Sequence, residues 1–232
     1  MIRSTHLGTL VIAVALGLGT GVATGQPTEL IIRNGTIIAD EGTVRGDLRI
    51  RNGLIDEIGE RLAAGSGARE IDASGLLVLP GGIDHVAYTR EQKLDPTQTV
   101  QRHRAGMNNL QVMRPMLFSD GIRTGRITVG QFVALTATNP AKLFGLYPAK
   151  GTIAVGADAD LVIWDPDETR TIRDEDALSN TGFSIHAGRE VTGWPIVTIR
   201  RGEVVYENGR VTGRAGSGRL APRRRWKPPI LN

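Results

Sequence analysis

Side chains that could bind a metal or activate a nucleophile are few in this sequence and lie far apart. The chain contains no cysteine and four histidines, His6, His85, His103 and His186. Without cysteine, a disulfide framework and a thiolate metal site are both excluded, so any metal would need histidine, carboxylate or modified lysine ligands. The histidines are too widely separated to form a local metal-binding motif.

Other polar residues have simpler structural explanations than chemistry. Asp158 and Asp160 in the segment GADAD form a carboxylate pair, but they stand where a turn enters a strand, so we expect turn-forming aspartates. Asn139, which precedes a proline, is expected to cap a helix. His186 lies in a polar stretch and is expected to be solvated.

The first 25 residues have the layout of a secretory signal peptide. Arg3 precedes a short apolar run, Leu10–Leu18, and the small residues Ala23 and Gly25 suit cleavage before Gln26. The apolar run is shorter than the roughly 20 residues that a bilayer span needs. We therefore expect export to the periplasm or the medium, with no stable membrane span after the signal is removed.

Composition favours a turn-rich β-structure with a genuine core. The 232 residues are 40% hydrophobic, 4% aromatic and include 30 glycines. The formal net charge of +4 comes largely from the tail, residues 214–232. A basic tail can bind nucleic acid or anionic lipid. Because no nucleic-acid-binding module surrounds it, we expect a solvated extension that contacts a neighbouring subunit, and no nucleic-acid partner.

Both ends of the mature chain show strand and turn patterns. Asn34-Gly35 and Asn52-Gly53 separate β-branched or alternating runs, which predicts two hairpins. The segments Asp160–Asp165, Ile196–Arg200 and Glu203–Glu207, the last followed by the turn Asn208-Gly209, repeat the pattern near the other end. A hairpin with one apolar face needs a second layer, so residues 26–80 and 149–213 are predicted to form one composite β-sandwich, with Trp164 and Trp194 in its core.

The middle of the chain changes to a helical period. Val129–Ala137 has a helix-compatible apolar face, with Thr128 as the predicted N-cap. Pro140–Gly145 predicts a second short helix that Gly145 closes. Arg102–Met113 is compatible with either a loop or a helix.

Four segments in order along the chain resemble one enzyme family. LIIRNGTII and IDASGLLVLPGGID are similar to the amino end of the dihydropyrimidinase and D-hydantoinase group of the amidohydrolase superfamily. The long segment from Met116 to Asp167, MLFSDGIRTGRITVGQFVALTATNPAKLFGLYPAKGTIAVGADADLVIWDPD, resembles the carboxyl end of these enzymes, and EVTGWPIVTIRRGEVVYENG continues it. The resemblance covers nearly all of residues 29–213.

The resemblance implies a (β/α)8 barrel inserted into a small β-sandwich, usually in homo-oligomers. It also implies hydrolysis of carbon–nitrogen bonds in small cyclic amides such as hydantoins or dihydropyrimidines. Two divalent metals, usually zinc, would be held by a His-x-His pair, a carboxylated lysine, two further histidines and an aspartate. Paired metals lower the pKa of a bridging water and so supply a hydroxide nucleophile.

This chain departs from the family where the ligands should be. A whole barrel takes about 250 residues, whereas residues 81–148 leave room for a remnant only. Asp84 and His85 stand where a strand-one Asp and the first His-x-His ligand would lie, but Ala87 replaces the second histidine. Alternatively, DHVAYTREQKL resembles the strand-eight segment, which makes Asp84 the catalytic aspartate. Asn108 and Asn109 correspond to a loop that lines the substrate pocket.

The sequence therefore predicts a mixed α/β fold: a composite β-sandwich built from both chain ends, with a truncated remnant of an inserted (β/α)8 barrel. The predicted site residues are Asp84 for catalysis, Asp84 and His85 for metal binding, and Asn108 and Asn109 for substrate binding. The lineage is hydrolytic, but a single chain lacks a complete zinc site, so we expect no activity from it. The alternative is a non-catalytic β-sandwich remnant or an interaction protein.

Overall fold

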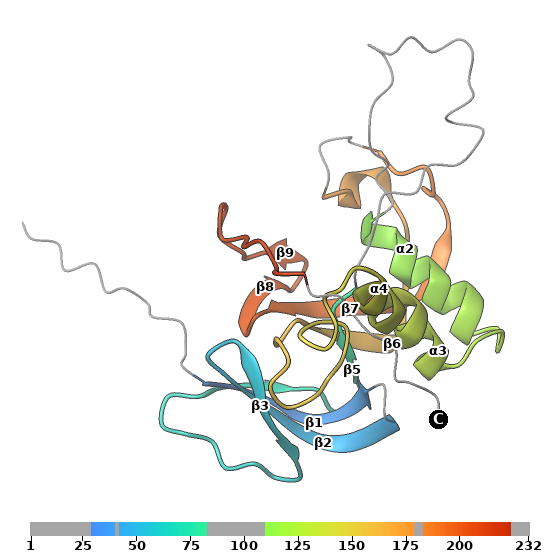
Figure 1. Ribbon diagram of the computed structural model, residues 1–232. Helices are drawn as coiled ribbons and strands as arrows, with labels where there is room; N and C mark the ends of the chain where they lie inside the picture. Colours follow the sequence, from blue (N-terminus) through green and yellow to red (C-terminus); the bar gives the residue numbers. More distant parts are fainter. Residues whose placement is uncertain (1–28, 40–41, 83–109, 179–182, 224–232) are drawn as a thin grey trace, which may run out of the picture.

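Nine strands in the described part of the chain form one sheet. The computed structural model describes residues 29–39, 42–82, 110–178 and 183–223 (Figure 1). The strands are β1 (Glu29–Ala39), β2 (Gly42–Arg51), β3 (Leu54–Gly59), β4 (Arg69–Asp72), β5 (Leu77–Pro80), β6 (Leu161–Thr171), β7 (Glu190–Arg200), β8 (Glu203–Glu207) and β9 (Arg210–Val211). Their order is β3-β2-β1-β5-β6-β7-β8-β9, and β4 pairs with β1.

Strands from the two ends of the chain meet at β5 and β6. These strands pair antiparallel, with Leu77 opposite Trp164 and Pro80 opposite Leu161. The chain ends therefore share one β-structure, as the sequence predicts. The hydrogen bonds describe a single continuous sheet, whereas two separate sheets were expected.

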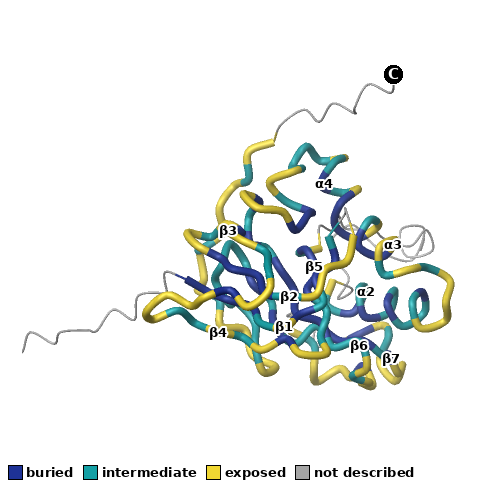
Figure 2. The backbone as a smooth tube through the Cα atoms, turned by 90° about the horizontal axis from the view of Figure 1, so that it is seen from below, coloured by how far each residue is buried: buried dark blue, intermediate teal, exposed yellow. Residues whose placement is uncertain are grey.

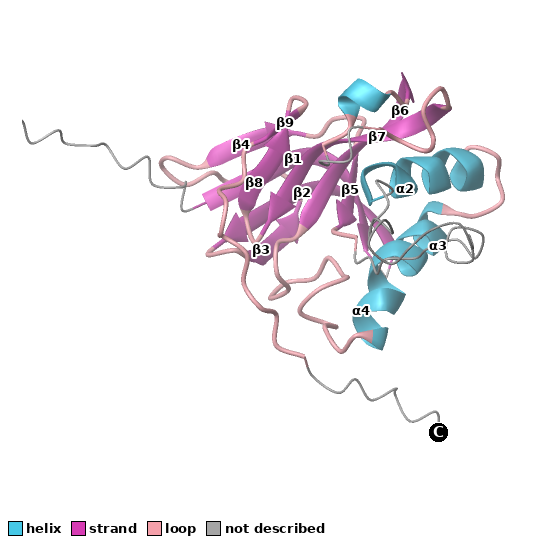
Figure 3. Cartoon of the chain, turned by 90° about the horizontal axis from the view of Figure 1, so that it is seen from above, coloured by secondary structure: helices cyan, strands magenta, loops and turns pink. Residues whose placement is uncertain are grey.

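The two halves of this sheet close over a common aliphatic core, which we call the inner core. Successive side chains of a strand point to opposite faces. Ile32 and Leu48 of the first half and Ile163 and Ile199 of the second half therefore point into one buried cluster. In the view of Figure 3, β8 overlaps β1 and β2, and the ion pair of Arg69 with Glu207 joins β4 to β8; the buried residues follow the central strands in Figure 2. A single curved sheet thus buries one face on itself.

Two of the three Asn-Gly turns behave as predicted. Asn52 and Gly53 have φ values of 52° and 81° between β2 and β3, and Asn208-Gly209 has 53° and 75° between β8 and β9. Positive φ at both central residues is the requirement of a type I′ hairpin. The turn between β7 and β8 uses Arg201-Gly202 in the same way, a turn that the sequence did not reveal.

The predicted hairpin at Asn34-Gly35 is wrong. Strand β1 runs through these residues, and the pairing with β2 shifts between Ile32 and Gly35, which marks a β-bulge. The backbone N–H of Asn34 donates to Asp47 Oδ1 at 3.0 Å. A Cβ at Gly35 would lie 2.7 Å from Val78 Cγ2, so the glycine allows β5 to pass close to the bulge.

The helices cover the other face of β5, β6 and β7 (Figure 3). They are α2 (Leu110–Leu117), η1 (Phe118–Ile122), α3 (Val129–Val133), η2 (Ala134–Thr138) and α4 (Asn139–Leu143), with the short turn η3 (Asp174–Asp176) before β7. None of the helices described is long and apolar enough to cross a bilayer.

The ends of these helices test three predictions about their caps. Thr128 is the N-cap of α3, and the Thr128 and Gln131 side chains form a reciprocal capping box, as predicted for Thr128. Gly145 follows α4 with φ of 69°, as expected of a C-terminal glycine. The capping role of Asn139 is wrong, because the helical backbone continues from η2 into α4 with no side-chain cap.

Both predicted core tryptophans are buried, but in the layer beneath the helices and not in the inner core. Trp164 packs with Phe118 and Phe132, whose ring centroids lie 5.2 Å and 5.9 Å from it. Trp194 packs with Val112 of α2. The alternation of each strand decides this placement, because Ile163 takes the inner face and its neighbour Trp164 must point outward.

Candidate functional site

The predicted site residues Asp84, His85, Asn108 and Asn109 all lie outside the described residues. The structure describes the chain on each side of them. On one side it ends at Gly82, just after β5, and on the other it resumes at Leu110, where α2 begins. These two ends are therefore the starting point for a candidate site.

The end of β5 and the middle of α2 are in direct contact. The backbone N–H of Gly81 donates to the carbonyl oxygen of Asp160 at 2.7 Å, which continues the β5–β6 pairing by one residue. A Cβ at Gly82 would lie 3.0 Å from both Cδ and Nη1 of Arg114. The absence of a side chain at Gly82 lets the arginine lie across the strand end.

An open cavity of about 820 Å³ lies between α2 and the helix-side face of β6, β7 and β8. We call it the α2 cavity. Its polar and aromatic lining includes Arg114, Lys150, Asp160, Trp164, Trp194 and Arg200. A volume of this size is typical of small-molecule sites.

Arg114 is the least expected residue of this cavity. Its Cζ lies 5.4 Å from the centroid of Phe132 and 5.8 Å from that of Trp164, so the guanidinium makes cation–π contacts with both rings. Its Nε and Nη2 atoms are buried and have no hydrogen-bond partner. Burial lowers the pKa of Arg114 to about 10, so the side chain remains charged at neutral pH.

Lys150 also lines the cavity and has its own counter-ions. Its Nζ lies 2.9 Å from Asp158 Oδ2 and also contacts Asp160 Oδ2. Desolvation would lower the pKa of Lys150, but the hydrogen bonds to the two carboxylates outweigh it and raise the pKa. Asp160 also accepts a hydrogen bond from the Arg201 backbone N–H at 2.8 Å. The two aspartates thus bind the ammonium group of Lys150, and Asp160 also holds the turn at Arg201.

This donor set does not fit a two-metal centre. The described ranges contain no group of three or more His, Cys, Asp or Glu side chains that could hold a metal ion. The carboxylates of Asp158 and Asp160 are paired with an ammonium group, which competes with any cation. His186 is half-buried, and its backbone N–H donates to Ser184 Oγ at 3.2 Å.

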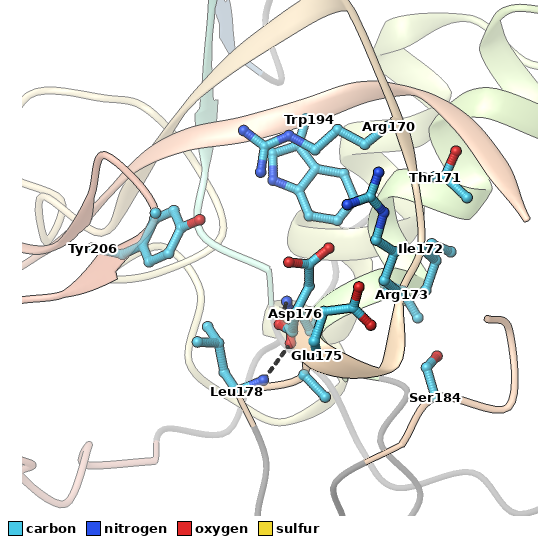
Figure 4. Close-up of a pocket in the computed structure, with 14 residues that line it drawn as sticks. Arg170, Thr171, Ile172, Arg173, Glu175, Asp176, Leu178, Ser184, Trp194 and Tyr206 are labelled. Atoms are coloured by element: carbon cyan, nitrogen blue, oxygen red, sulfur yellow. Dashed lines mark hydrogen bonds between the residues drawn. The ribbon is translucent and has the colours of Figure 1, made fainter. Parts of the chain in front are cut away.

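A smaller cavity of about 240 Å³ lies beside the first, lined by residues that Figure 4 labels. Arg170 lies over the Trp194 ring at 4.9 Å from its centroid. The Gln111 side chain donates to the Asp176 carbonyl oxygen at 2.9 Å and accepts from the Leu178 N–H at 3.0 Å. The lining contains two arginines, Arg170 and Arg173, and two carboxylates. The positive and negative charges of the lining are therefore equal in number. Together with the Gln111 hydrogen bonds, this indicates a structural contact that attaches α2 to the loop after η3.

Relatives of known sequence align with a little over 60% of the chain. A dihydropyrimidinase of Rattus norvegicus is 41% identical over 142 residues, covering 61% of this chain and 27% of the rat protein. A D-phenylhydantoinase of Escherichia coli is 38% identical over 149 residues, covering 64% of this chain and 32% of that protein. The aligned region thus spans about a quarter to a third of the length of these relatives.

Solved structures show the same fold. A dihydropyrimidinase from Brevibacillus agri superimposes with a TM-score of 0.73 and 17% sequence identity, covering 87% of this chain and 100% of that chain. A D-hydantoinase structure superimposes with a TM-score of 0.71, covering 86% of this chain and 100% of that chain, also at 17% identity. At 17% sequence identity, this similarity is evidence for the fold alone.

A sequence model of the Amidohydrolase family matches residues 67–205, well over half of the chain. The protein belongs to this family. Within it, the matches place the chain among the hydantoinase-like members, as the sequence motifs predicted.

Sequence analysis did not single out Arg114 as a functional residue. The available signal was a charged residue inside the apolar run VMRPML, where Val112 and Pro115 are buried. A charged side chain in such a run is expected to have a specific partner. Its aromatic neighbours come from α3 and β6, which no local pattern connects to α2.

Proposed function

We propose that this protein descends from metal-dependent hydrolases of small cyclic amides and that a single chain does not itself open such rings. Family membership and the relatives' names, dihydropyrimidinase and D-phenylhydantoinase, support the lineage. The observation that carries the second part is the connection between β5 and α2. Only residues 81–109 join them, whereas a complete (β/α)8 barrel needs about 250 residues.

The ligand inventory supports the same proposal. After the predicted signal segment, the sequence retains His85, His103 and His186 and contains no His-x-His pair. A family centre would use four histidines, a modified lysine and an aspartate, and zinc would supply the water-activating chemistry. Residues around a metal site tune it but do not replace its ligands. What remains of the fold is a scaffold that can bind small molecules.

The test is metal content and ring opening on the purified chain without its first 25 residues. We expect well under two zinc ions per chain after dialysis, and no hydrolysis of hydantoin or dihydrouracil above the buffer rate, with or without added zinc. An intact hydantoinase assayed in parallel is the positive control. Zinc-dependent turnover by the monomeric chain, which a chelator abolishes and added zinc restores, would overturn the proposal.

Oligomerisation is the one route by which several chains could assemble a site, and the family resemblance predicts homo-oligomers. We propose that the chain self-associates through its scaffold. Light scattering after size exclusion should give a mass above the 24.9 kDa of one full chain. If the assay also detected hydrolysis that disappeared on dilution to monomer, the site would be shared between subunits and the single-chain statement would stand.

We also propose export, from the signal-like layout of residues 1–25, which lie outside the described residues. Expression with a carboxy-terminal tag should release a mature form that begins at Gln26 outside the cytoplasm. Mass spectrometry of the amino terminus in each cell fraction provides the check, and an uncleaved chain confined to the cytoplasm would contradict it.

A further inference from the structure

Unpartnered hydrogen-bond donors gather around the α2 cavity. Among the described residues, six buried side-chain nitrogens lack a partner, and five of them belong to residues that line this cavity. The five are Arg114 Nε, Arg114 Nη2, Trp164 Nε1, Trp194 Nε1 and Arg200 Nε. All are donors, and the large majority of buried side-chain polar atoms in folded proteins have a hydrogen-bond partner. The cavity is therefore short of acceptors.

The charge of the cavity is equally unbalanced at one place. Lys150 is paired with Asp158 and Asp160, and Arg200 Nη2 lies 2.9 Å from Glu203 Oε2. Arg114 has no carboxylate partner among the described residues and is stabilised by ring faces alone. Contacts with ring faces leave its N–H groups unused. The buried uncompensated positive charge of the cavity thus lies at Arg114, since Arg214, the other lining arginine without an ion pair among the described residues, is exposed.

The two free donors of Arg114 define the shape of the missing acceptor. Nε and Nη2 form one edge of the planar guanidinium, and their N–H groups point in nearly the same direction. Two parallel N–H groups match the two oxygens of a carboxylate in a bidentate pair. The flat apolar surfaces of Trp164 and Trp194 line the same cavity and suit an aromatic ring.

We propose that the α2 cavity is a binding site for a small aromatic carboxylate, which pairs side-on with Arg114 and packs on the tryptophan walls. This inference goes beyond the proposed function, because it concerns binding and requires neither metal nor ring opening. Burial of the guanidinium, which lowers the pKa of Arg114, would be offset by the ligand's charge.

The test is a calorimetric titration of the purified full chain with sodium phenylacetate. Phenylacetamide, which has the same ring and no charge, is the matched ligand, and inorganic phosphate is the competing anion. We expect saturable phenylacetate binding at least tenfold tighter than that of either comparison ligand. No saturable binding of phenylacetate at millimolar concentration, or equal binding of the amide or of phosphate, would overturn the proposal.

Two arginine variants assign the site. Arg114→Lys keeps the charge and removes the planar donor edge, so phenylacetate affinity should fall at least tenfold. Arg123→Lys is the matched control, since Arg123 is exposed, pairs with Asp167 at 3.1 Å and lies outside the cavity. Equal affinities in both variants would place the ligand elsewhere and contradict the proposal. If Arg114→Lys does not fold, the acid-against-amide comparison on the unaltered protein decides.

Discussion

The two faces of the sheet differ in how completely their polar groups are paired. The inner core is aliphatic, and the buried carboxylate of Asp47 beside it accepts hydrogen bonds from the backbones of Asn34 and Leu62 and from Arg33. The helix-side face is aromatic and carries five buried donors without partners. The aliphatic side pairs nearly all of its polar groups within the chain, with Arg49 Nε as the exception among the described residues, whereas the helix side leaves five donors unpaired.

The largest effect is expected where the sheet meets the helices. Gly193 has a φ of 101°, and a Cβ there would lie 2.2 Å from Phe118 Cδ1. Gly193→Ala should therefore lower the free energy of unfolding by about 4 kcal/mol through backbone strain and overpacking together. Urea unfolding measures the loss.

Gly188→Ala separates the two causes. Gly188 has a similar φ of 86°, but a Cβ there would have no neighbour within 4 Å. Only the strain remains, so we expect a loss of about 1 kcal/mol. Equal losses in the two variants would show that the helix layer yields to the added methyl group and is not tightly packed on β7.

The polar network beside the inner core gives the next effect. Asparagine at position 47 would keep one acceptor but present an NH₂ group to donors now bound by the second oxygen. Asp47→Asn should cost about 3 kcal/mol, because charge-assisted bonds are lost and buried donors are left unpaired. Asp56→Asn, at an exposed ion pair with Arg51, is the control and should change stability by under about 0.5 kcal/mol.

We expect the carboxylate of Asp47 to make the stability of the folded protein depend on pH. Burial would raise the pKa of Asp47, but hydrogen bonds from Asn34, Arg33 and Leu62 outweigh it and hold the pKa below the ordinary 3.8. The folded protein then binds this proton less readily than the unfolded chain, so acid favours unfolding. The contribution is complete above about pH 4 and is lost as the pH falls through the lowered pKa. Asp47→Asn should flatten the acid limb of a stability profile.

A smaller effect is expected at the margin of the α2 cavity. Lys150→Met would leave Asp158 and Asp160 close together without their shared cation. We expect a loss of about 2 kcal/mol, from partly buried charges left unpaired. Arg123→Met breaks an exposed pair and should be nearly neutral. If thermal unfolding found both substitutions neutral, the ion pairs of Lys150 with Asp158 and Asp160 would not stabilise the fold.

The smallest effect concerns the start of α3. Thr128→Ala removes the side-chain acceptor for the Gln131 N–H and should cost about 1 kcal/mol. Gln131→Ala removes the reciprocal bond to the Thr128 N–H at 2.8 Å. In a double-mutant cycle the two losses should be less than additive, because each side chain supports the other. Strict additivity would mean that the two bonds act independently.

Local patterns in the sequence were sufficient where a structure depends on neighbouring residues. The turns at Asn52-Gly53 and Asn208-Gly209 and the cap at Thr128 follow from φ preferences and from one side-chain hydrogen bond. The ordered family motifs likewise predicted the hydantoinase-like membership from the sequence alone. The predicted catalytic and metal-binding residues, Asp84 and His85, lie outside the described residues and remain predictions.

Tertiary structure decided everything that depends on segments distant in sequence. Asn34-Gly35 has the composition of a hairpin, yet Asp47 holds the Asn34 backbone and β5 passes beside Gly35, so the strand continues through a bulge. Likewise, Arg114 stands in an ordinary helical run, and only the packing of α3 and β6 against α2 surrounds it with rings and leaves its donors free. Sequence sets local conformational preference, while desolvation and close approach are set by the whole fold.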